Sequence, residues 1–427
     1  MPATVSRPSA TPLSRSGAVA LDPQLKAIEE KVTAGRRLSL DDGRKLYETA
    51  DLWGVCALAD RVRRRLHSDT TYYNINRHLN YSNVCALSCA FCEFYRKAGQ
   101  EGAYEHSIEQ IRAEARAARD AGATEMHIVG GLHPKLPFEY YTDMLRAIAQ
   151  EAPRLHLKAF TAVEIVHFAK IAKKYKNADR SSGIRWVLES LKEAGLGSLP
   201  GGGAEVFDDR VHNEAYKGKI RSDVWLDVHR VAHQLGLNTN ATMLYGHIET
   251  IDDRLTHMDL LRRAQDEGLG ALGYDADDEG AVTLTGPGAT PPTPTMNAAG
   301  GYFQTITPLP FFPDGSALER LPGPSGVENL RTIALARLML DNFPHVKAFW
   351  IMQTLPMAQL QLLAGADDID GTVVWYDITK VGGVSTHQEM NSGDLQRAIR
   401  QAGFSPVERD TLYRRINRTG AEWRVVE

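Results

Sequence analysis

The chain has 427 residues, of which 43% are hydrophobic and 24% are charged, and its formal net charge is -4. This is the balance of a globular protein with a substantial core, and the slight acidity gives no electrostatic reason to expect a nucleic-acid partner. No stretch of the sequence approaches the roughly 20 apolar residues that a membrane helix needs. We therefore expect a soluble protein, and the four cysteines, three of them within eight residues, favour a reducing compartment, the cytoplasm.

The N-terminal part is predicted to be a tail followed by helices. Residues 1–22 are rich in Ser, Pro, Ala and Arg and lack the apolar segment of a secretory signal, so we expect a disordered tail. From 23 to 70 the apolar residues recur three and four positions apart, which is typical of helices. Cys56 lies on an apolar face of this helical extension, where a lone cysteine is most often a core residue.

From residue 71 to 390 short apolar segments alternate with helical patterns. One such helix begins at Ser107 with a capping box closed by Gln110. The alternation predicts an α/β fold, a (β/α) barrel of the TIM type, in which chemistry takes place on the loops that follow the strands. The expected strands are 72–81, 125–129, 156–161, 197–199, 237–244, 302–307, 346–352 and 372–376.

Two further segments complete the predicted organisation. Residues 275–301 are dominated by Gly, Pro, Thr and Ala, which predicts an exposed, flexible insertion in the barrel. Residues 391–427 are predicted to form a C-terminal helix and a closing segment.

Three of the four cysteines fall within eight residues, at Cys85, Cys89 and Cys92. A structural zinc site, or an Fe–S cluster that only carries electrons, usually has four protein ligands. The fourth cysteine, Cys56, is far upstream, so this loop offers three thiolates. Three thiolates on a 4Fe–4S cluster leave one iron open to a further ligand, and this is the metal site that we predict.

Glycines and carboxylates follow the next strands. Gly130 and Gly131 come after the second strand, where glycine lets the backbone approach a ligand closely. Acidic residues follow the third, fourth and fifth strands, where they suit contacts to ribose hydroxyls or to a sulfonium centre; equally, such carboxylates often cap the helices that follow. They are Glu164, Glu205 and, beside Gly246, Glu249.

The cysteine loop, with Phe91 before its last cysteine, resembles the C-x3-C-x-aromatic-C signature of the radical S-adenosylmethionine (SAM) superfamily. The resemblance implies that SAM binds the open iron and is split by an electron into methionine and a 5′-deoxyadenosyl radical. It also implies that Gly130 and Gly131 bind the amino group of SAM. The expected cofactors are therefore a 4Fe–4S cluster and SAM, with SAM consumed.

Further segments resemble the aminofutalosine synthase family of the futalosine route to menaquinone. The sister family, dehypoxanthine futalosine cyclase, shares several of them and is the first alternative. Two details favour the synthase: the tripeptide His-Ile-Val at 127–129, directly before the paired glycines, and the segment YGHIET at 245–250. A non-catalytic Fe–S electron carrier is the alternative from another class. The segments are RHLNYSN at 77–83, FYRK at 94–97, EGAYEHS at 101–107, HIVGGLHPKLPFEYY at 127–141, LPGGGAEVF at 199–207, MLYGHIET at 243–250, GADDIDGTV at 365–373 and PVERDTLY at 406–413.

This second resemblance implies a reaction. The adenosyl radical adds to the enol ether of 3-[(1-carboxyvinyl)oxy]benzoate, and loss of a carboxylate gives 6-amino-6-deoxyfutalosine. A flavodoxin or ferredoxin is the expected electron donor. Because the substrate has two carboxylates, at least one guanidinium is expected at the barrel mouth, and Arg77 and Arg96 are the candidates.

Overall fold

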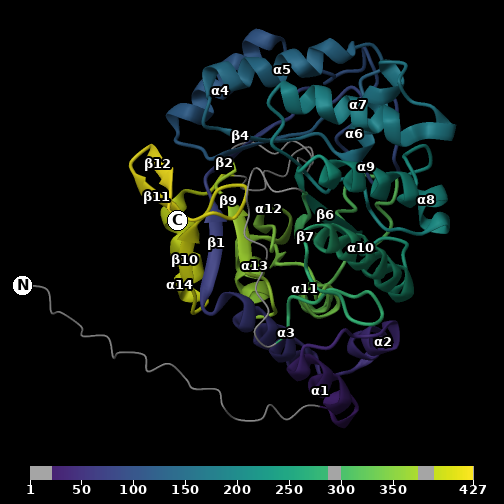
Figure 1. The fold of residues 1–427 in the computed structure, drawn as a ribbon, viewed down its shortest axis with the longest axis vertical. Helices are drawn as coiled ribbons and strands as arrows, with labels where there is room; N and C mark the ends of the chain where they lie inside the picture. Colours follow the sequence, from purple (N-terminus) through teal and green to yellow (C-terminus); the bar gives the residue numbers. More distant parts are fainter. Residues whose placement is uncertain (1–21, 287–299, 374–388, 427) are drawn as a thin grey trace, which may run out of the picture.

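The structure is a computed structural model that describes residues 22–286, 300–373 and 389–426. Seven parallel strands form one curved sheet in the order β2-β3-β4-β5-β6-β7-β8, and the helices between them lie around its outside (Figure 1). This arrangement confirms the predicted (β/α) barrel class, and helices α1 to α3 form the N-terminal extension. The strands are β2 Asn76–Leu79, β3 Glu125–Ile128, β4 His156–Ala159, β5 Ser198–Leu199, β6 Asn238–Tyr245, β7 Phe303–Pro310 and β8 His345–Val346.

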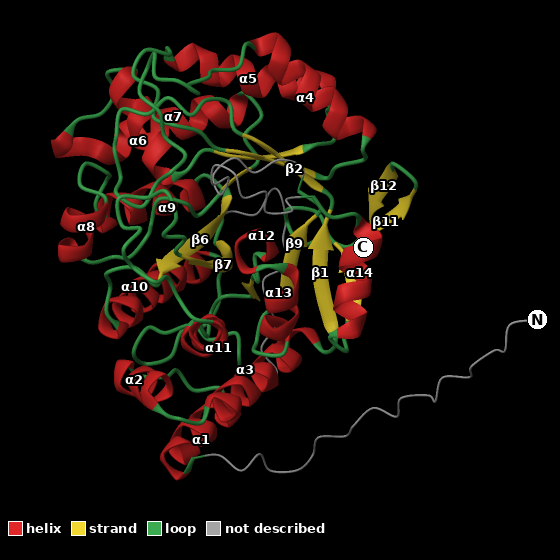
Figure 2. Cartoon of the chain, turned by 180° about the vertical axis from the view of Figure 1, so that it is seen from behind, coloured by secondary structure: helices red, strands yellow, loops and turns green. Residues whose placement is uncertain are grey.

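A second parallel sheet places a strand that precedes the barrel between two strands of the C-terminal region (Figure 2). Its central strand is β1, Thr70–Asn74, which pairs with β9, Asp368–Gly371, on one side and with β10, Ser405–Glu408, on the other. A bridge between Lys347 and Asp368 connects β8 to β9, so the second sheet continues the curve of the first. A two-stranded hairpin follows, β11 Ile416–Thr419 and β12 Glu422–Val425.

Many helices begin at a side-chain cap. Capping boxes open α2, α4, α6 and α10, and Ser107 with Gln110 forms the predicted box. Among the described helices, none is both long and apolar enough to span a bilayer. The helices are η1 Pro23–Leu25, α1 Lys26–Ala34, α2 Leu40–Glu48, α3 Leu52–His67, α4 Ile108–Asp120, α5 Phe138–Glu151, α6 Ala162–Ile171, η2 Asn177–Asp179, α7 Arg180–Glu193, α8 Asp209–Ala215, α9 Ser222–Gln234, α10 Ile251–Ala271, α11 Gly326–Met339, α12 Trp350–Gln353, α13 Leu355–Leu362 and α14 Ser392–Gln401.

Three strand predictions differ from the structure. The run 72–81 is not one strand, because it divides at Ile75 into β1 and β2, which pair in different sheets. The run 346–352 is a strand only at its first residue and becomes α12 at Trp350. A short apolar run does not distinguish a buried strand from a buried helix, which explains this second error. The predicted strand 372–376 is displaced, because β9 ends at Gly371 and Thr372 and Val373 are not in a strand; residues 374–376 lie outside the described residues.

The predicted insertion is partly packed. Val282 and Leu284 are buried against Leu269 and Tyr302, and the backbone N–H of Leu284 donates to the Asp341 carbonyl at 2.9 Å. The expectation of an exposed loop therefore does not hold for these residues. Residues 287–299, and residues 1–21 of the predicted tail, lie outside the described residues.

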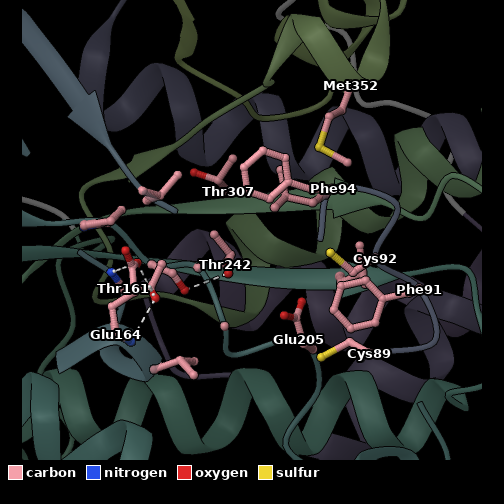
Figure 3. A pocket seen from close by; sticks show the side chains of 18 of the residues that line it. Cys89, Phe91, Cys92, Phe94, Thr161, Glu164, Glu205, Thr242, Thr307 and Met352 are labelled. Carbon is pink, nitrogen blue, oxygen red and sulfur yellow. Dashed lines mark hydrogen bonds between the residues drawn. The ribbon is translucent and has the colours of Figure 1, made fainter. Parts of the chain in front are cut away.

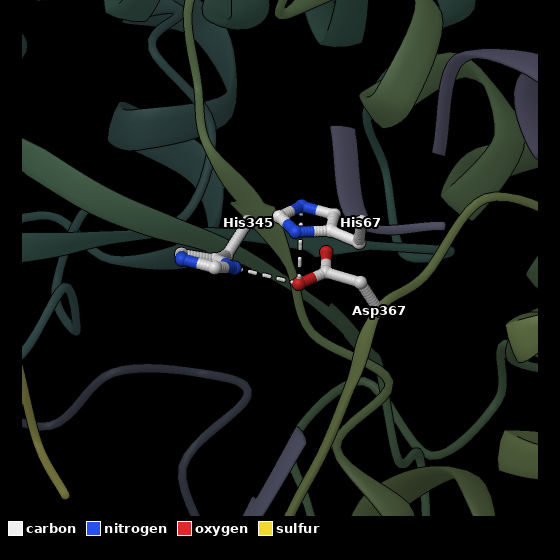
Figure 4. Close-up of side chains that lie close together, drawn as sticks. All are labelled: His67, His345 and Asp367. Atoms are coloured by element: carbon white, nitrogen blue, oxygen red, sulfur yellow. Dashed lines mark hydrogen bonds and ion pairs between the residues drawn. The ribbon is translucent and has the colours of Figure 1, made fainter. Parts of the chain in front are cut away.

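A buried ionic cluster joins the N-terminal helices to the last barrel strands (Figure 4). His345 Nδ1 lies 2.6 Å from Asp367 Oδ2, and the His67 ring stacks on the His345 ring with 4.9 Å between centroids. Arg337 of α11 binds the other Asp367 oxygen, and His67 Nε2 lies 2.8 Å from the Pro344 carbonyl. Although these groups are close enough to suggest a metal site, their ligand atoms already have protein partners. Burial lowers the pKa of His67 to about 3, so its imidazole is neutral. We interpret the cluster as structural.

Candidate functional site

A cavity of about 310 Å³ lies at the carboxyl ends of the barrel strands, where the fold predicts the chemistry. Its size is within the range of small-molecule sites, and most of its lining is apolar. In Figure 3 the cysteine loop lies on one side of the cavity, and the loop with Thr161 and Glu164 lies on the other. The lining includes Cys85, Cys89, Phe91, Cys92, Phe94, Gly130, Gly131, Lys158, Thr161, Glu164, Gly201, Gly202, Gly203, Glu205, Lys219, Asn240, Thr242, Thr307, Leu309, Phe311, Lys347, Phe349, Met352 and Asp370.

All three clustered cysteines line this cavity from the loop between β2 and α4. The Lys97 ammonium supports the loop from outside by donating to the carbonyls of Cys85, Ala86 and Leu87 at 3.1, 3.2 and 2.8 Å. Cys56, in contrast, is buried in α3 and does not line the cavity, in agreement with a packing role. The cavity therefore receives three thiols and no fourth cysteine, a donor set that fits a 4Fe–4S cluster with one open iron.

Burial of the Cys89 and Cys92 thiol groups affects metal binding. Burial raises the pKa of Cys89 to about 11 and also raises the pKa of Cys92. The Lys219 ammonium nearby acts in the opposite direction on both thiols. Because metals bind the thiolate, loading of iron into this loop must release protons.

Glycines bring two loops close to neighbouring backbone or rings. A Cβ on Gly130 would lie 2.5 Å from the Tyr81 ring, and a Cβ on Gly131 would lie 2.3 Å from the Val84 carbonyl oxygen. After β5, a Cβ on Gly201 would lie 2.5 Å from the Ala241 backbone. Only glycine fits at these places, so both loops present backbone to the cavity.

Glu164 connects two parts of the site. Its Oε2 accepts hydrogen bonds from the Thr161 N–H at 2.7 Å and from the Thr161 hydroxyl at 2.8 Å, which forms the capping box of α6. Its Oε1 accepts from the Tyr81 hydroxyl at 2.8 Å and from the Gly130 N–H at 3.1 Å. The carboxylate lines the cavity, yet it caps a helix and fixes the paired-glycine loop. Contact with a cofactor stays a prediction for this residue.

Glu164 gives a pH-dependent prediction. Burial raises its pKa from 4.5 to about 7, so the folded protein binds this proton more tightly than the unfolded chain does. Its contribution to stability is complete below pH 4.5 and is lost as the pH rises through about 7. Relative to a Glu164→Gln variant, the wild-type free energy of unfolding should fall by roughly 3 kcal/mol between pH 4.5 and 8. Calorimetric unfolding at several pH values measures this difference, with the exposed Glu139→Gln as control. A difference that does not change with pH would contradict it.

Glu205 and Phe91 lie next to a cation that the sequence analysis missed. Glu205, which follows β5 with φ 47°, forms an ion pair with Lys219. The Lys219 ammonium also lies 4.9 Å from the centre of the Phe91 ring. Lys219 comes after α8 rather than at a strand end, so no local pattern marks it. This ion pair places a carboxylate and an ammonium group beside the cysteine loop.

The motif predicted after the fifth barrel strand, Gly246 with Glu249, lies away from the cavity lining. Glu249 accepts hydrogen bonds from the backbone N–H of Gly246 at 2.6 Å and of His247 at 2.9 Å. It also accepts from Arg254 Nε at 2.7 Å. Gly246 has φ 91° in this turn. Gly246 and Glu249 therefore shape the start of α10, and neither lines the cavity.

The two candidate arginines are also outside the cavity lining. Arg77 lies in β2, and its Nη1 is 3.7 Å from a carboxylate oxygen of Glu114. Arg96 donates to the carbonyls of Glu93 and Tyr95 at 2.7 and 2.8 Å. The Lys and Arg side chains that line the cavity are, among the described residues, Lys158, Lys219 and Lys347.

Comparison with protein families gives two matches. Residues 79–261 match the model of the radical SAM superfamily, and residues 299–420 match the model of the CofH/MqnC C-terminal region. The first match contains the cysteine loop and the Gly and Glu motifs. The second contains Lys347 and Asp370.

Several curated proteins are similar to most of the chain. Aminodeoxyfutalosine synthase of Thermus thermophilus is 42% identical, over 92% of this chain and 96% of that protein. The synthase of the same name from Streptomyces coelicolor is 41% identical, over 92% and 94%. A 5-amino-6-(D-ribitylamino)uracil--L-tyrosine 4-hydroxyphenyl transferase from Methanosphaerula palustris is 33% identical, over 92% and 98%.

Solved structures show the same fold at low identity. Methylornithine synthase has a TM-score of 0.63 at 16% identity, over 89% of this chain and 97% of that one. The FeFe-hydrogenase maturase of Carboxydothermus hydrogenoformans has a TM-score of 0.61 at 15% identity, over 91% and 80%. These likenesses concern the fold alone.

Proposed function

Because the chain belongs to the radical SAM superfamily, we propose that it catalyses the aminodeoxyfutalosine synthase reaction of menaquinone biosynthesis. In this reaction the adenosyl group of SAM joins 3-[(1-carboxyvinyl)oxy]benzoate, and a carboxylate is lost to give 6-amino-6-deoxyfutalosine. The observation that carries the proposal is the 42% identity to a synthase over 92% of the chain, together with three thiols that face one cavity.

Different residues around the cavity would bind the cluster and SAM. Cys85, Cys89 and Cys92 would hold the 4Fe–4S cluster, and Phe91 would lie beside it. When bound, the cluster supplies the electron that splits SAM. We propose that Gly130 and Gly131 offer backbone groups to the methionine part of SAM.

Carboxylates and apolar side chains would complete the site. Glu205, held by Lys219, and Glu164, held by four hydrogen bonds, are the proposed acidic contacts for SAM. The apolar lining excludes water and leaves few hydrogen donors near a reactive carbon. The role of Gly246 and Glu249 in this proposal is indirect, because they shape the turn that follows β6.

The proposal also includes an electron donor and a cellular compartment. A flavodoxin or ferredoxin is the proposed electron donor, since a one-electron reduction is required. The proposed compartment is the cytoplasm, because all four cysteines are free thiols and a reducing environment keeps them so.

The test is product analysis. We expect the anaerobically reconstituted protein, given reductant, substrate and SAM labelled with 13C in the adenosyl group, to place the label in 6-amino-6-deoxyfutalosine and to release one methionine per product. Mass spectrometry measures both, and a mixture without substrate is the control. Label found only in free 5′-deoxyadenosine would contradict the synthase assignment and would favour the cyclase. Failure to form methionine would favour an electron carrier.

A further inference from the structure

Two buried lysines reach the cavity from inside the barrel. Lys158 lies within β4, three positions before Thr161, and pairs in register with His127 of β3 and Ser198 of β5. Lys347 follows β8 directly and bridges to Asp368 of β9. Both line the cavity, although only 3% and 4% of their surfaces are exposed. Their ammonium groups therefore lie at the inner end of the cavity rather than at its rim.

Each lysine has one carboxylate partner. Lys158 Nζ donates to Glu125 Oε1 at 2.5 Å, and Lys347 Nζ donates to Asp370 Oδ1 at 3.0 Å. An ammonium group has three donors, so in the described parts of the chain each lysine keeps two without a protein acceptor. Buried donors without acceptors cost free energy unless a ligand or water accepts from them. Because both groups line the cavity, the acceptor can be a molecule bound there.

The two positive charges also influence each other. Burial lowers the pKa of Lys158, and the nearby Lys347 lowers it further, against the effect of Glu125. Asp370, the partner of Lys347, also acts against this lowering. Because Glu125 and Asp370 each balance one of these charges, an anion bound here would be held by the remaining N–H donors of the two ammonium groups.

The remainder of the cavity suits an aromatic molecule. Phe94, Phe349, Met352, Leu309 and Phe311 contribute rings and apolar chains to the lining. A ring packs on such a surface, while a carboxylate on the ring requires charge-assisted partners. The lysine pair supplies these partners within the same cavity.

We propose that Lys158 and Lys347 form a carboxylate subsite that holds the benzoate carboxylate of the substrate, with its ring on the apolar lining. This inference rests on the proposed function. Of the two substrate carboxylates, the benzoate group is the one that the reaction keeps, so it can anchor the molecule from binding until release. The subsite takes the role that the sequence analysis gave to Arg77 and Arg96.

The first test is a binding measurement on the reconstituted holoenzyme without reductant. Calorimetry compares 3-methoxybenzoate with 3-methoxybenzamide, which differs mainly in charge. We expect the wild type to prefer the carboxylate by roughly 30-fold, the value of one or two charge-assisted hydrogen bonds. Lys347→Met and Lys158→Met should each remove most of this preference. Lys192→Met, an exposed lysine on α7, should keep it.

Two double variants distinguish loss of binding from loss of folding. Loss of one lysine leaves a buried carboxylate without its partner, which is strongly destabilising. Lys158→Met with Glu125→Gln, and Lys347→Met with Asp370→Asn, remove both charges of each pair. These double variants should fold and should also lack the preference. In turnover, the KM for the substrate should rise by roughly 30-fold while the KM for SAM stays unchanged.

The outcomes separate this inference from the proposed function. If folded double variants still prefer the carboxylate probe, or if the wild type binds both probes equally, the subsite is overturned whatever product is formed. If the lysines control the preference but no adenosylated product appears, the carboxylate subsite stands and the synthase assignment fails. A rise in the KM for SAM of the same size as that for the substrate would also overturn the subsite.

Discussion

Replacement of Cys85, Cys89 or Cys92 by alanine should abolish SAM cleavage in the reconstituted protein, whereas Cys56→Ala should leave it intact. The three cysteines line one cavity from one loop, and Cys56 is buried in α3. Loss of an outer-shell partner at a metal site typically costs about 10- to 100-fold, and loss of a direct ligand should cost well over 100-fold. Methionine formation from SAM measures the effect.

Iron content gives a second measurement of the same prediction. Each single variant in the loop should bind less iron after anaerobic reconstitution and lose the absorption of a 4Fe–4S cluster. Cys56→Ala should match the wild type in both measurements. A loop variant that keeps a full cluster, or a Cys56→Ala protein that loses it, would show that the ligand set is different.

Gly131→Ala should lower SAM cleavage by roughly 100-fold even though the change adds only one methyl group. This methyl group would lie 2.3 Å from the Val84 carbonyl oxygen and 2.7 Å from its carbon, directly before Cys85. Since backbone cannot rotate away as a flexible side chain can, the start of the cysteine loop must move. Overpacking of this kind costs about 1–3 kcal/mol, and a displacement near 1 Å at a reacting centre costs about 100-fold in rate.

Gly270→Ala is the matched control for this prediction. Gly270 lies in α10, and a Cβ there has nothing within 4 Å. Alanine in a helix is favoured over glycine by about 1 kcal/mol, so this variant should be at least as stable as the wild type. Steady-state rates and melting temperatures of the two variants provide the comparison. Equal rates for Gly131→Ala and wild type would mean that the loop accommodates the methyl group.

The parts of the site that could be predicted from the sequence are those whose signal is local. Cys85, Cys89 and Cys92 are close in the chain, so their spacing alone indicates the metal site. Gly130 and Gly131 follow a recognisable strand. Capping boxes are also local signals. A capping box does not reveal whether its carboxylate has a second role, however, because Glu164 both caps α6 and lines the cavity.

Other parts depend on partners that are distant in the sequence. Lys158 and Lys347 meet at one cavity only because β4 and β8 belong to one curved sheet. A lysine within a strand has no spacing that indicates its direction. The division of 72–81 into β1 and β2 is similar, because β1 is defined by its pairing with β9 and β10. The arginines follow from their position next to the motif; neither lines the cavity, and their contact with a substrate carboxylate stays a prediction.

The central place of β1 between β9 and β10 has a consequence for how the chain matures on the ribosome. Strand β1 leaves the exit tunnel early, but both strands that cover its edges are translated near the opposite end of the chain. At 5–20 residues per second, β1 waits roughly 15 to 60 seconds with open backbone edges. Exposed strand edges recruit other chains, so nascent copies should depend on chaperones during this interval, and release of a chain that ends before Ser405 should yield aggregates.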